Sequence, residues 1–327
     1  MKRFKTLTYI IISITLVFAS CKKSVNRNVE CDDIEELILS TDFSNCEVYE
    51  FTKKSDKIHS TDTTSNNSSV WDELQSHHSI GDFHISYEDG TRDQRYAEIC
   101  KDPMNAENDV LKFKIIEPPI REGTHKKGRV QANFHDNQCI KEYYQTVRLY
   151  LHPDIEFLKQ WEEQVHWLSL FEFWNNANWT RERNPFRVTV NLIKNVNGPA
   201  ENMYFAAKGD RDIILGGWDP IWYETAENFS VPFGIWMEIE MYLLEGDEST
   251  GRFYMAITPE NGEKSVLFDV YNTTQHPREN YPDGYTQINA LKFYTTDKII
   301  NQMKDNNKKL EIYWDDWIVY RSKDLTD

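Results

Sequence analysis

The sequence predicts an all-β fold, a jelly-roll sandwich of two antiparallel sheets with one or two short helices. From Ile80 onward, short runs of alternating apolar and polar residues recur, and this period of two is typical of strands with one buried face. Turn-forming residues separate the runs, for example at 245–247, 261–263 and 282–284. Many strands without a βαβ rhythm favour two packed antiparallel sheets.

The predicted strands occupy 111–116, 143–151, 186–193, 236–244, 252–258, 265–270 and 310–320. The run 143–151 shows the pattern, because Val147 and Leu149 share one face while the opposite face is polar or aromatic. That second face carries Tyr144, Arg148 and Tyr150. Such side chains on the open face of a strand are candidates for ligand contact.

Helical patterns are scarce, and much of the first 80 residues is polar. Residues 297–304 predict a short helix with Asp297 as its N-cap, and 154–164 are a second candidate. Residues 33–39 predict one or two helical turns, whereas 52–69 are rich in Ser, Thr and Asn and predict a loop. We therefore expect residues 21–80 to be a weakly structured lead-in to a single jelly-roll domain at 81–327.

Residues 1–20 have the layout of a secretory signal peptide. A basic head is followed by an apolar run over 6–18 and by two small residues before Cys21. The apolar run is shorter than the ~20 residues that a membrane-spanning helix needs. The stretch Phe-Ala-Ser-Cys at 18–21 resembles the bacterial lipobox, and the resemblance implies a lipid on Cys21. The alternative is an ordinary secreted protein in which Cys21 has no such role.

Four cysteines remain after Cys21, at positions 31, 46, 100 and 139. An even number in an oxidising compartment predicts two disulfides, with three ways to pair them. Proximity in the sequence favours Cys31 with Cys46 and Cys100 with Cys139. Free buried thiols are the alternative.

The charge balance limits the partners. The chain has 37 Lys and Arg against 53 Asp and Glu, a net charge of −16, and removal of residues 1–20 takes it to −19 because three basic residues leave. This excess repels nucleic acid, so we expect no nucleic-acid partner. No phosphate-binding glycine-rich loop, G-x-S-x-G elbow or H-E-x-x-H helix occurs, and we expect no required cofactor.

Aromatic residues are abundant, with 10 Trp, 17 Tyr and 17 Phe, and they cluster with amides at 167–179. Aromatic rings beside amide and carboxylate groups suit sugar recognition. With Phe171 and Phe173 in the core, the open face carries Glu172, Trp174 and Asn176. Strict alternation would then place the preceding leucines on the open face as well, so a bulge is needed to bring them into the core. The next predicted strand adds Arg187 and Asn191.

If the strands 143–151, 167–179 and 186–193 are neighbours, these side chains join Tyr144, Arg148 and Tyr150 in one groove that suits a polysaccharide. Solvated strand faces are the alternative, as is a cross-strand ion pair between Arg148 and Glu172.

Six segments carry a resemblance to a known fold: 128–131, 144–151, 171–175, 231–236, 251–254 and 313–317. Together they resemble the concanavalin A-like jelly roll and, more narrowly, the polysaccharide-lyase and glycan-binding lipoproteins of Bacteroidetes. The resemblance covers about residues 80–320. It implies a concave sheet that binds glycan and a convex sheet behind it.

Lyases of this fold use a Gln-x-His motif, a Tyr acid or base, and an Arg that neutralises the uronate. Gln164-Val165-His166 matches the motif, although it precedes the position where the motif is expected. On a lyase interpretation, Tyr144 or Tyr150 is base and acid, Arg148 or Arg187 balances the carboxylate, and His166 assists. The Glu-x-Asp-x-x-Glu strand of related hydrolases is absent from the sequence.

Jelly-roll glycan modules often hold a structural calcium ion near an acidic pair. Asp315 and Asp316 in the last predicted strand form such a pair, and calcium prefers oxygen ligands. Two capping or exposed aspartates are the alternative.

Taken together, the sequence favours a cell-envelope lipoprotein, on the periplasmic side or the outer-membrane surface, that binds a polysaccharide for glycan uptake. Its expected partners are the polysaccharide, the membrane through Cys21, and other glycan-uptake proteins. The alternatives are a lyase that cleaves a uronic-acid glycan by β-elimination and a structural envelope protein.

Overall fold

The computed structural model describes residues 34–62, 69–87, 91–118, 127–175, 186–213, 217–277, 284–323 and 325. These residues belong to one compact unit, Asp33–Asp327. The predicted signal peptide, Cys21 and Cys31 lie outside the described residues. None of the described helices is long and apolar enough to cross a membrane.

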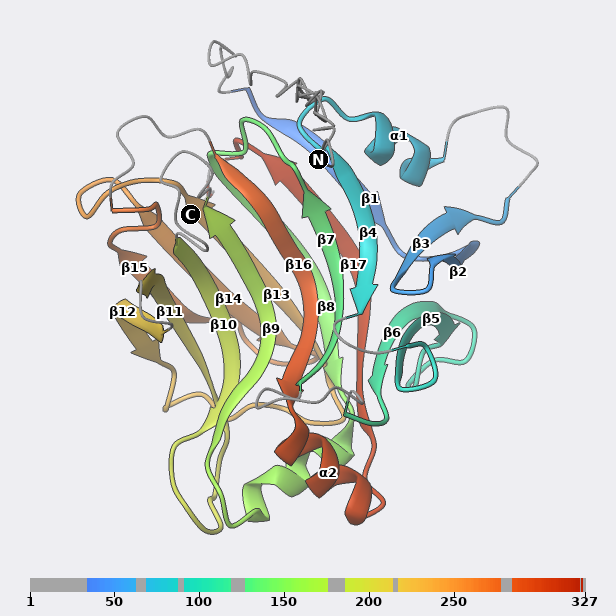
Figure 1. The fold of residues 1–327 in the computed structure, drawn as a ribbon, viewed down its shortest axis with the longest axis vertical. Helices are drawn as coiled ribbons and strands as arrows, with labels where there is room; N and C mark the ends of the chain where they lie inside the picture. Colours follow the sequence, from blue (N-terminus) through green and yellow to red (C-terminus); the bar gives the residue numbers. More distant parts are fainter. Residues whose placement is uncertain are drawn as a thin grey trace, which may run out of the picture. The chain divides into compact units, whose positions relative to one another are not determined.

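Two antiparallel sheets form the fold (Figure 1), which confirms the predicted class. Sheet A has the strand order β15-β14-β13-β8-β17-β6-β5, and β1 also pairs with β17. Its strands are β1 (Glu36–Thr41), β5 (Arg95–Lys101), β6 (Asp109–Ile115), β8 (Glu142–Leu151), β13 (Trp236–Leu244), β14 (Arg252–Pro259), β15 (Ser265–Tyr271) and β17 (Leu310–Arg321).

Sheet B has the strand order β12-β11-β10-β9-β16-β7-β4-β3-β2. Its strands are β2 (Cys46–Thr52), β3 (Ser55–Ser60), β4 (Asp82–Tyr87), β7 (Lys127–His135), β9 (Val165–Asn175), β10 (Phe186–Lys194), β11 (Tyr204–Ile213), β12 (Gly217–Thr225) and β16 (Tyr285–Thr296). Every predicted strand corresponds to a strand of the structure.

The core lies between the sheets and is built by the alternation that the sequence shows. Val147 and Leu149 of β8 and Phe171 and Phe173 of β9 belong to one cluster, and all four are fully buried. Fully burying an aliphatic or aromatic side chain contributes about 1.5–3 kcal/mol. The alternate residues of the same strands point to the outer faces of the two sheets.

The structure corrects the prediction for the N-terminal part of the domain. Residues 36–60, expected to belong to a weakly structured lead-in, form β1, β2 and β3. The predicted helical turns at 33–39 are wrong, because β1 pairs with β17 from Glu36 opposite Arg321 to Thr41 opposite Trp317. An isolated seven-residue helix is marginal in water, whereas pairing with β17 satisfies the backbone and buries Leu39.

Among the residues that the structure describes, three short helices connect the strands: α1 (Val70–Ser76), the 3₁₀ helix η1 (Pro153–Gln160) and α2 (Asp297–Asp305). Helix α2 was predicted, but its N-cap is Thr296, whose side chain accepts a hydrogen bond from the Ile299 amide. Asp297 instead lies in the first turn, where its negative charge is favourable.

Both disulfides favoured by proximity are wrong, because Cys46 and Cys100 are free thiols. The Cys46 sulfur accepts a hydrogen bond from Trp71 Nε1 at 3.1 Å. Burial raises the pKa of Cys100 to about 11. Burial also raises the pKa of Cys46, against the Trp71 hydrogen bond, so each thiol is protonated at neutral pH.

Candidate functional site

The candidate site is the outer face of sheet B, which points away from sheet A. Strand β9 turns Phe171 and Phe173 into the core and Glu172 and Trp174 to this outer face, as the alternation predicts. The predicted bulge is confirmed at Leu170, where the register between β9 and β10 shifts by one residue. Because the bulge adds one residue, the leucines before it and the phenylalanines after it can all face the core.

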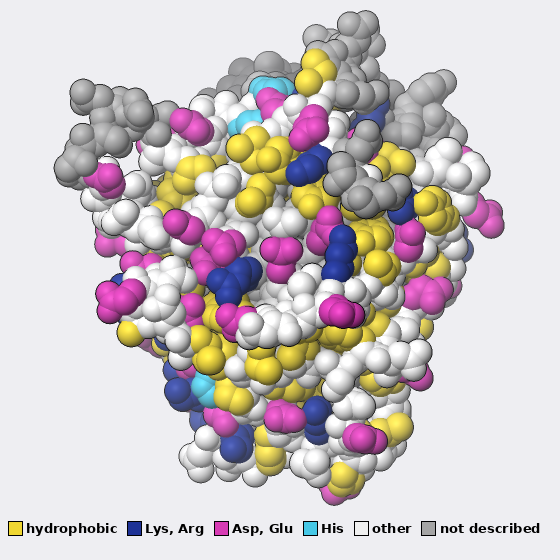
Figure 2. Space-filling view, turned by 180° about the vertical axis from the view of Figure 1, so that it is seen from behind, with side chains coloured by type: hydrophobic (Ala, Val, Ile, Leu, Met, Phe, Trp, Pro, Cys, Tyr) yellow, Lys and Arg dark blue, Asp and Glu magenta, His cyan; other side chains and the backbone are white. Residues whose placement is uncertain are grey.

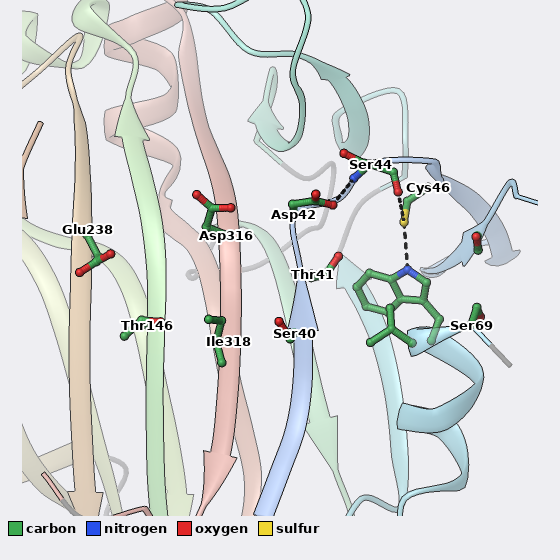
Figure 3. Close-up of a pocket in the computed structure, with 13 residues that line it drawn as sticks. Ser40, Thr41, Asp42, Ser44, Cys46, Ser69, Thr146, Glu238, Asp316 and Ile318 are labelled. Atoms are coloured by element: carbon green, nitrogen blue, oxygen red, sulfur yellow. Dashed lines mark hydrogen bonds between the residues drawn. The ribbon is translucent and has the colours of Figure 1, made fainter. Parts of the chain in front are cut away.

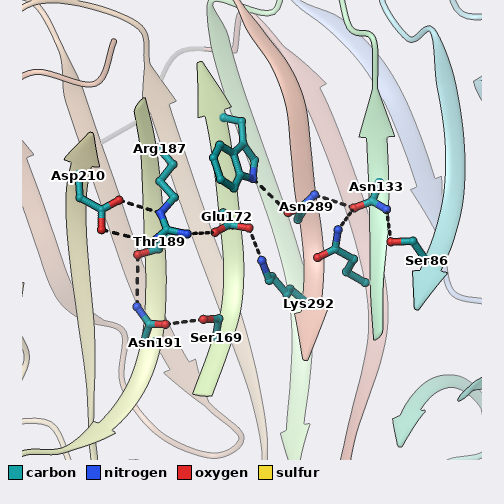
Figure 4. Close-up of polar contacts among 12 residues, drawn as sticks. Ser86, Asn133, Ser169, Glu172, Arg187, Thr189, Asn191, Asp210, Asn289 and Lys292 are labelled. Carbon is teal, nitrogen blue, oxygen red and sulfur yellow. Dashed lines mark hydrogen bonds and ion pairs between the residues drawn. The ribbon is translucent and has the colours of Figure 1, made fainter. Parts of the chain in front are cut away.

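A row of charged side chains crosses the centre of this face (Figure 4). Lys292 of β16 donates to Glu172, and Arg187 Nη1 of β10 donates to the other Glu172 oxygen at 2.8 Å. Arg187 Nε then donates to Asp210 Oδ1 of β11 at 2.7 Å, and Lys208 Nζ lies 2.7 Å from Asp210 Oδ2. We call these five residues the charged row.

The charges of the row fix the ionisation of Glu172. Burial opposes its negative charge, but Lys292 and Arg187 outweigh that cost and lower the pKa of Glu172 to about 2. Burial also lowers the pKa of Lys292 to about 8. The negative charge of Glu172 raises this pKa, whereas the positive charge of Arg129 lowers it further. The face therefore holds a firmly ionised carboxylate beside a lysine that loses its proton more easily than usual.

Amide side chains continue the polar strip on the other side of β9 (Figure 4). Trp174 Nε1 donates to Asn289 Oδ1 at 3.4 Å, and Asn289 Nδ2 donates to Asn133 Oδ1 at 2.6 Å. Gln131 Nε2 donates to the same Asn133 oxygen at 2.6 Å, while Asn133 Nδ2 donates to Ser86 Oγ at 2.7 Å. Asn289, Asn133 and Gln131, here called the amide row, are thus held in fixed orientations.

Two pairs of aromatic rings lie at the two ends of the polar strip along β9. Trp174 and Trp218 meet edge to face at 5.6 Å, and the Arg187 guanidinium lies 3.5 Å from the Trp218 ring centre. At the other end of β9, Trp167 and Tyr294 meet edge to face at 4.8 Å. The three tryptophans are partly exposed, so their rings are accessible from the outer face.

Several residues predicted for the site lie together on sheet B. Glu172, Trp174 and Arg187 do so, and Asn191 lies nearby, where it accepts a hydrogen bond from Ser169 Oγ at 2.6 Å. Asn176 lies outside the described residues. His166 is exposed at the beginning of β9.

The structure does not bring Tyr144, Arg148 and Tyr150 to this face. The condition that their strand neighbours 167–179 is not met, because β8 pairs with β13 and β17 in sheet A. The alternative of a cross-strand ion pair between Arg148 and Glu172 does not occur for the same reason. Period-two alternation places a side chain on one face of its strand, but it does not say which sheet the strand joins.

On the outer face of sheet A, the two tyrosines are poorly suited to act as bases. Burial and a hydrogen bond to Glu240 raise the pKa of Tyr144, and burial with the nearby Asp102 raises that of Tyr150. A general base at neutral pH needs the opposite shift. The catalytic roles given to this group on a lyase interpretation stay a prediction, which the raised pKa values of the two tyrosines do not support.

A pocket of about 590 Å³ opens beside β1 on the sheet A side of the molecule (Figure 3). Its lining includes Ser40, Thr41, Thr146, Glu238 and Asp316. Seen from behind the view of Figure 1, many acidic side chains lie among apolar ones (Figure 2). This pocket holds no residue of the charged row or of the amide row.

The acidic pair predicted to lie near calcium contacts a protein cation. Arg148 Nη1 lies 3.6 Å from both Asp315 Oδ2 and Asp316 Oδ2, and Asn108 Nδ2 donates to Asp315 Oδ2 at 2.9 Å. Burial raises the pKa of Asp315 to about 6. Calcium takes six to eight oxygen ligands, so an ion here would have to displace Arg148. A structural calcium ion stays a prediction.

Sequence reasoning missed the polar residues of β7 and β16. Lys292 and Asn289 point to the same face although they are three residues apart, because a bulge at Ala290 shifts the register with β7. The bulge breaks the alternation that would have revealed β16. Gln131 alternates normally with its apolar neighbours, so β7 did carry a detectable signal.

No family model matches the chain, and no curated protein matches it. Solved structures with a similar fold include the alginate lyase Aly36B, at 13% identity and a TM-score of 0.48, covering 88% of this chain and 98% of that one. The endo-β-1,4-glucuronan lyase from the fungus Trichoderma reesei has 12% identity, a TM-score of 0.42, and coverage of 71% and 89%. The marine PL-14 alginate lyase from Aplysia kurodai has 9% identity and a TM-score of 0.45, and the match covers 76% of this chain and 93% of that one. These neighbours are polysaccharide lyases, and the likeness concerns the fold alone.

Proposed function

We propose that this protein binds an acidic polysaccharide along the outer face of sheet B. The observation that carries the proposal is the arrangement along β9, where Trp167 and Trp174 lie at the two ends of a strip of charged and amide side chains. Seven residues of strand span roughly 23 Å at about 3.3 Å per residue. A face of that length accommodates several consecutive sugar units.

The chemistry of the face matches that of a sugar chain. Partly exposed rings can stack on the apolar C–H face of a pyranose. The amides beneath them are buried, with exposed fractions of 0% for Asn289 and 2% for Asn133, so they hold the shape of the face on which the rings lie. The Trp218 ring is held against Arg187, and the hydrogen bonds of the amide row fix Asn289 and Asn133. Fixed groups lose little entropy on binding, which favours affinity.

An acidic sugar is favoured by the local charge. Three cations of the charged row accompany its carboxylates Glu172 and Asp210; they are Arg187, Lys208 and Lys292. Lys127 and Arg129 lie beside the Tyr294 ring at the end of the strip. In a chain with a net charge of −16, such a local positive excess would concentrate an anionic ligand at this face.

The test is binding of the purified protein to soluble uronate polymers and to neutral glucans, measured by calorimetry and by retardation in affinity gels. We expect retention by at least one uronate polymer and weaker or no retention by neutral glucans. The double variant Trp174→Ala/Trp218→Ala should lose retention, whereas Tyr271→Ala, which removes a ring that is 63% exposed on β15, should keep it. Unchanged retention in the double variant would place the ligand elsewhere.

A second candidate function is cleavage of the same polymer by β-elimination, favoured by the lowered pKa of Lys292. Lys292 is buried and donates to Glu172, so it would first have to leave this ion pair. Once neutral and released, its amine would take the C5 proton of a uronate, the electrons would form the C4–C5 double bond, and the C4–O bond would break. Tyr294, two residues further on the same face, would protonate the leaving oxygen. With a pKa of about 8, roughly one tenth of Lys292 is neutral at pH 7.

Ultraviolet absorbance distinguishes the two functions, because elimination creates an unsaturated sugar end. Growth of absorbance that Lys292→Met abolishes, at a temperature where the unfolding curve shows the variant to be folded, would support cleavage. Binding of a uronate polymer without any absorbance change would leave the binding function and exclude the lyase.

The proposal includes a location in the cell envelope, with a lipid on Cys21 and a role beside other glycan-uptake proteins. The layout of residues 1–21 supports it. Incorporation of a labelled fatty acid in the parent but not in Cys21→Ser would test it.

A further inference from the structure

We propose that Glu36, His77 and His78 form a binding site for a divalent metal ion of the zinc class. The three residues come from two parts of the chain, since Glu36 begins β1 and the histidines follow α1. One ligand atom from each lies within 4.8 Å of the others. The site lies on no strand of sheet B, so it is independent of the proposed polysaccharide face.

The spacing of the ligand atoms fits a tetrahedral ion. Glu36 Oε1 lies 3.4 Å from His77 Nε2, and Glu36 Oε2 lies 3.7 Å from His78 Nε2. Zinc bonds of about 2.0–2.1 Å place neighbouring ligands of a tetrahedron roughly 3.3–3.4 Å apart. A modest movement of the His78 ring, whose side chain is 65% exposed, would complete three protein ligands and leave the fourth position to water.

Two of the ligand atoms, Glu36 Oε2 and His77 Nε2, are buried and have ion-pair partners but no hydrogen bond of good geometry. Arg321 Nη2 lies 3.1 Å from Glu36 Oε2, and Glu36 Oε1 lies 3.4 Å from His77 Nε2. Buried polar atoms usually have a well-directed hydrogen-bond partner. A bound cation would give both atoms a directed partner in the same place.

Two neighbours shape the site and limit its affinity. Arg321 Nη2 lies 3.1 Å from Glu36 Oε2 and orients the carboxylate, as partners of metal ligands commonly do, although its charge opposes that of the ion. The Ser79 amide donates to His77 Nδ1 at 3.2 Å. Because coordination through Nε2 requires a proton on Nδ1, metal binding must break this hydrogen bond.

Metal binding would add a link between two segments of the chain. Glu36 opens β1, an edge strand that pairs with β17, and the histidines lead from α1 into β4. A shared ion would therefore hold β1 against the turn between α1 and β4. We expect the ion to raise the melting temperature rather than to alter polysaccharide binding.

The experiment is calorimetric titration of the untagged chain, stripped with a chelator, with Zn²⁺ and then with Co²⁺. We expect one ion per chain and a visible Co²⁺ spectrum of four-coordinate type without sulfur bands. His78→Ala and Glu36→Gln should each weaken binding at least tenfold. His59→Ala is the matched control. His59 Nε2 lies 2.8 Å from a single carboxylate, that of Glu47, so this variant should bind the metal ion as the parent does.

Three results would overturn the proposal. One is Zn²⁺ affinity in His78→Ala equal to that of the parent, with folding of the variant verified by its unfolding curve. The second is binding that disappears in Cys46→Ser/Cys100→Ser, which would assign the metal to the free thiols. The third is the absence of saturable Zn²⁺ binding in the parent.

Discussion

Lys292 and Glu172 form a buried ion pair on the outer face of sheet B, where the residues of a strand normally meet solvent. Their exposed fractions are 0% and 3%. Lys292 comes from β16 and Glu172 from the neighbouring β9. The second Glu172 oxygen accepts from Arg187, so one carboxylate joins cations from two strands on either side of β9. This arrangement sets both the electrostatics and the stability of the proposed binding face.

Replacing Lys292 by Met should destabilise the protein strongly. The change leaves Glu172 with Arg187 alone, and breaking a buried ion pair from one side costs about 3–5 kcal/mol. The free energy of unfolding from denaturant titration measures the loss. Glu172→Leu/Lys292→Met should recover part of it, because no unpaired lysine or carboxylate then remains between β9 and β16.

The matched control is Lys298→Met. Lys298 pairs with Glu163 at 2.9 Å, but both side chains are exposed, so its loss should leave the unfolding curve unchanged. Similar small effects of both substitutions would contradict the assignment of Lys292 and Glu172 as a buried pair.

Stability should fall with acid in a window set by Glu172. Its pKa is lowered from 4.5 to about 2 in the folded protein, so the ionised form stabilises the fold above pH 4.5 and this contribution is lost as the pH falls toward 2. A difference of that size corresponds to about 3 kcal/mol. The stability difference between the parent and Glu172→Gln should therefore shrink from pH 5 to pH 2. A constant difference over that range would show that Glu172 does not titrate there.

The sequence predicted the sandwich because its strands alternate regularly, and the two outer faces follow from that alternation. It placed Glu172 and Trp174 correctly, since Phe171 and Phe173 define the core side of β9. It did not reveal which strands are neighbours. Consecutive strands β8 and β9 belong to different sheets, so the residues of β8 were assigned to the wrong face.

Other parts of the site were hidden for local reasons. Lys292 follows a bulge that breaks the period of β16, and Asp210 belongs to β11, a strand the sequence analysis did not identify. The first strand, β1, has a pattern that a helix would also satisfy, and only the free edge of β17 decides between them. Long-range pairing, rather than local preference, determines these elements.

Trp174→Ala should weaken polysaccharide binding about tenfold without unfolding the protein. The ring is partly exposed and touches Trp218 and Arg187, so its removal deletes a stacking surface and leaves the charged row intact. A tenfold loss corresponds to about 1.4 kcal/mol, in the range expected for one aromatic contact. Calorimetry with a uronate polymer measures the change. If Trp174→Ala and Trp167→Ala both bind the polymer with the dissociation constant of the parent, β9 does not form part of the binding face.

Substitutions on β8 should leave polysaccharide binding unchanged, because β8 belongs to sheet A. Tyr144→Phe removes a hydrogen bond of 2.9 Å to Glu240 and should cost about 1 kcal/mol of stability. Arg148→Ala removes the cation that faces Asp315 and Asp316 and should lower stability as well. Both variants should bind a uronate polymer with the affinity of the parent at a temperature where all three are folded. A loss of affinity in either variant, with an intact unfolding transition, would show that the outer face of sheet A takes part in binding and that the proposed face on sheet B is incomplete.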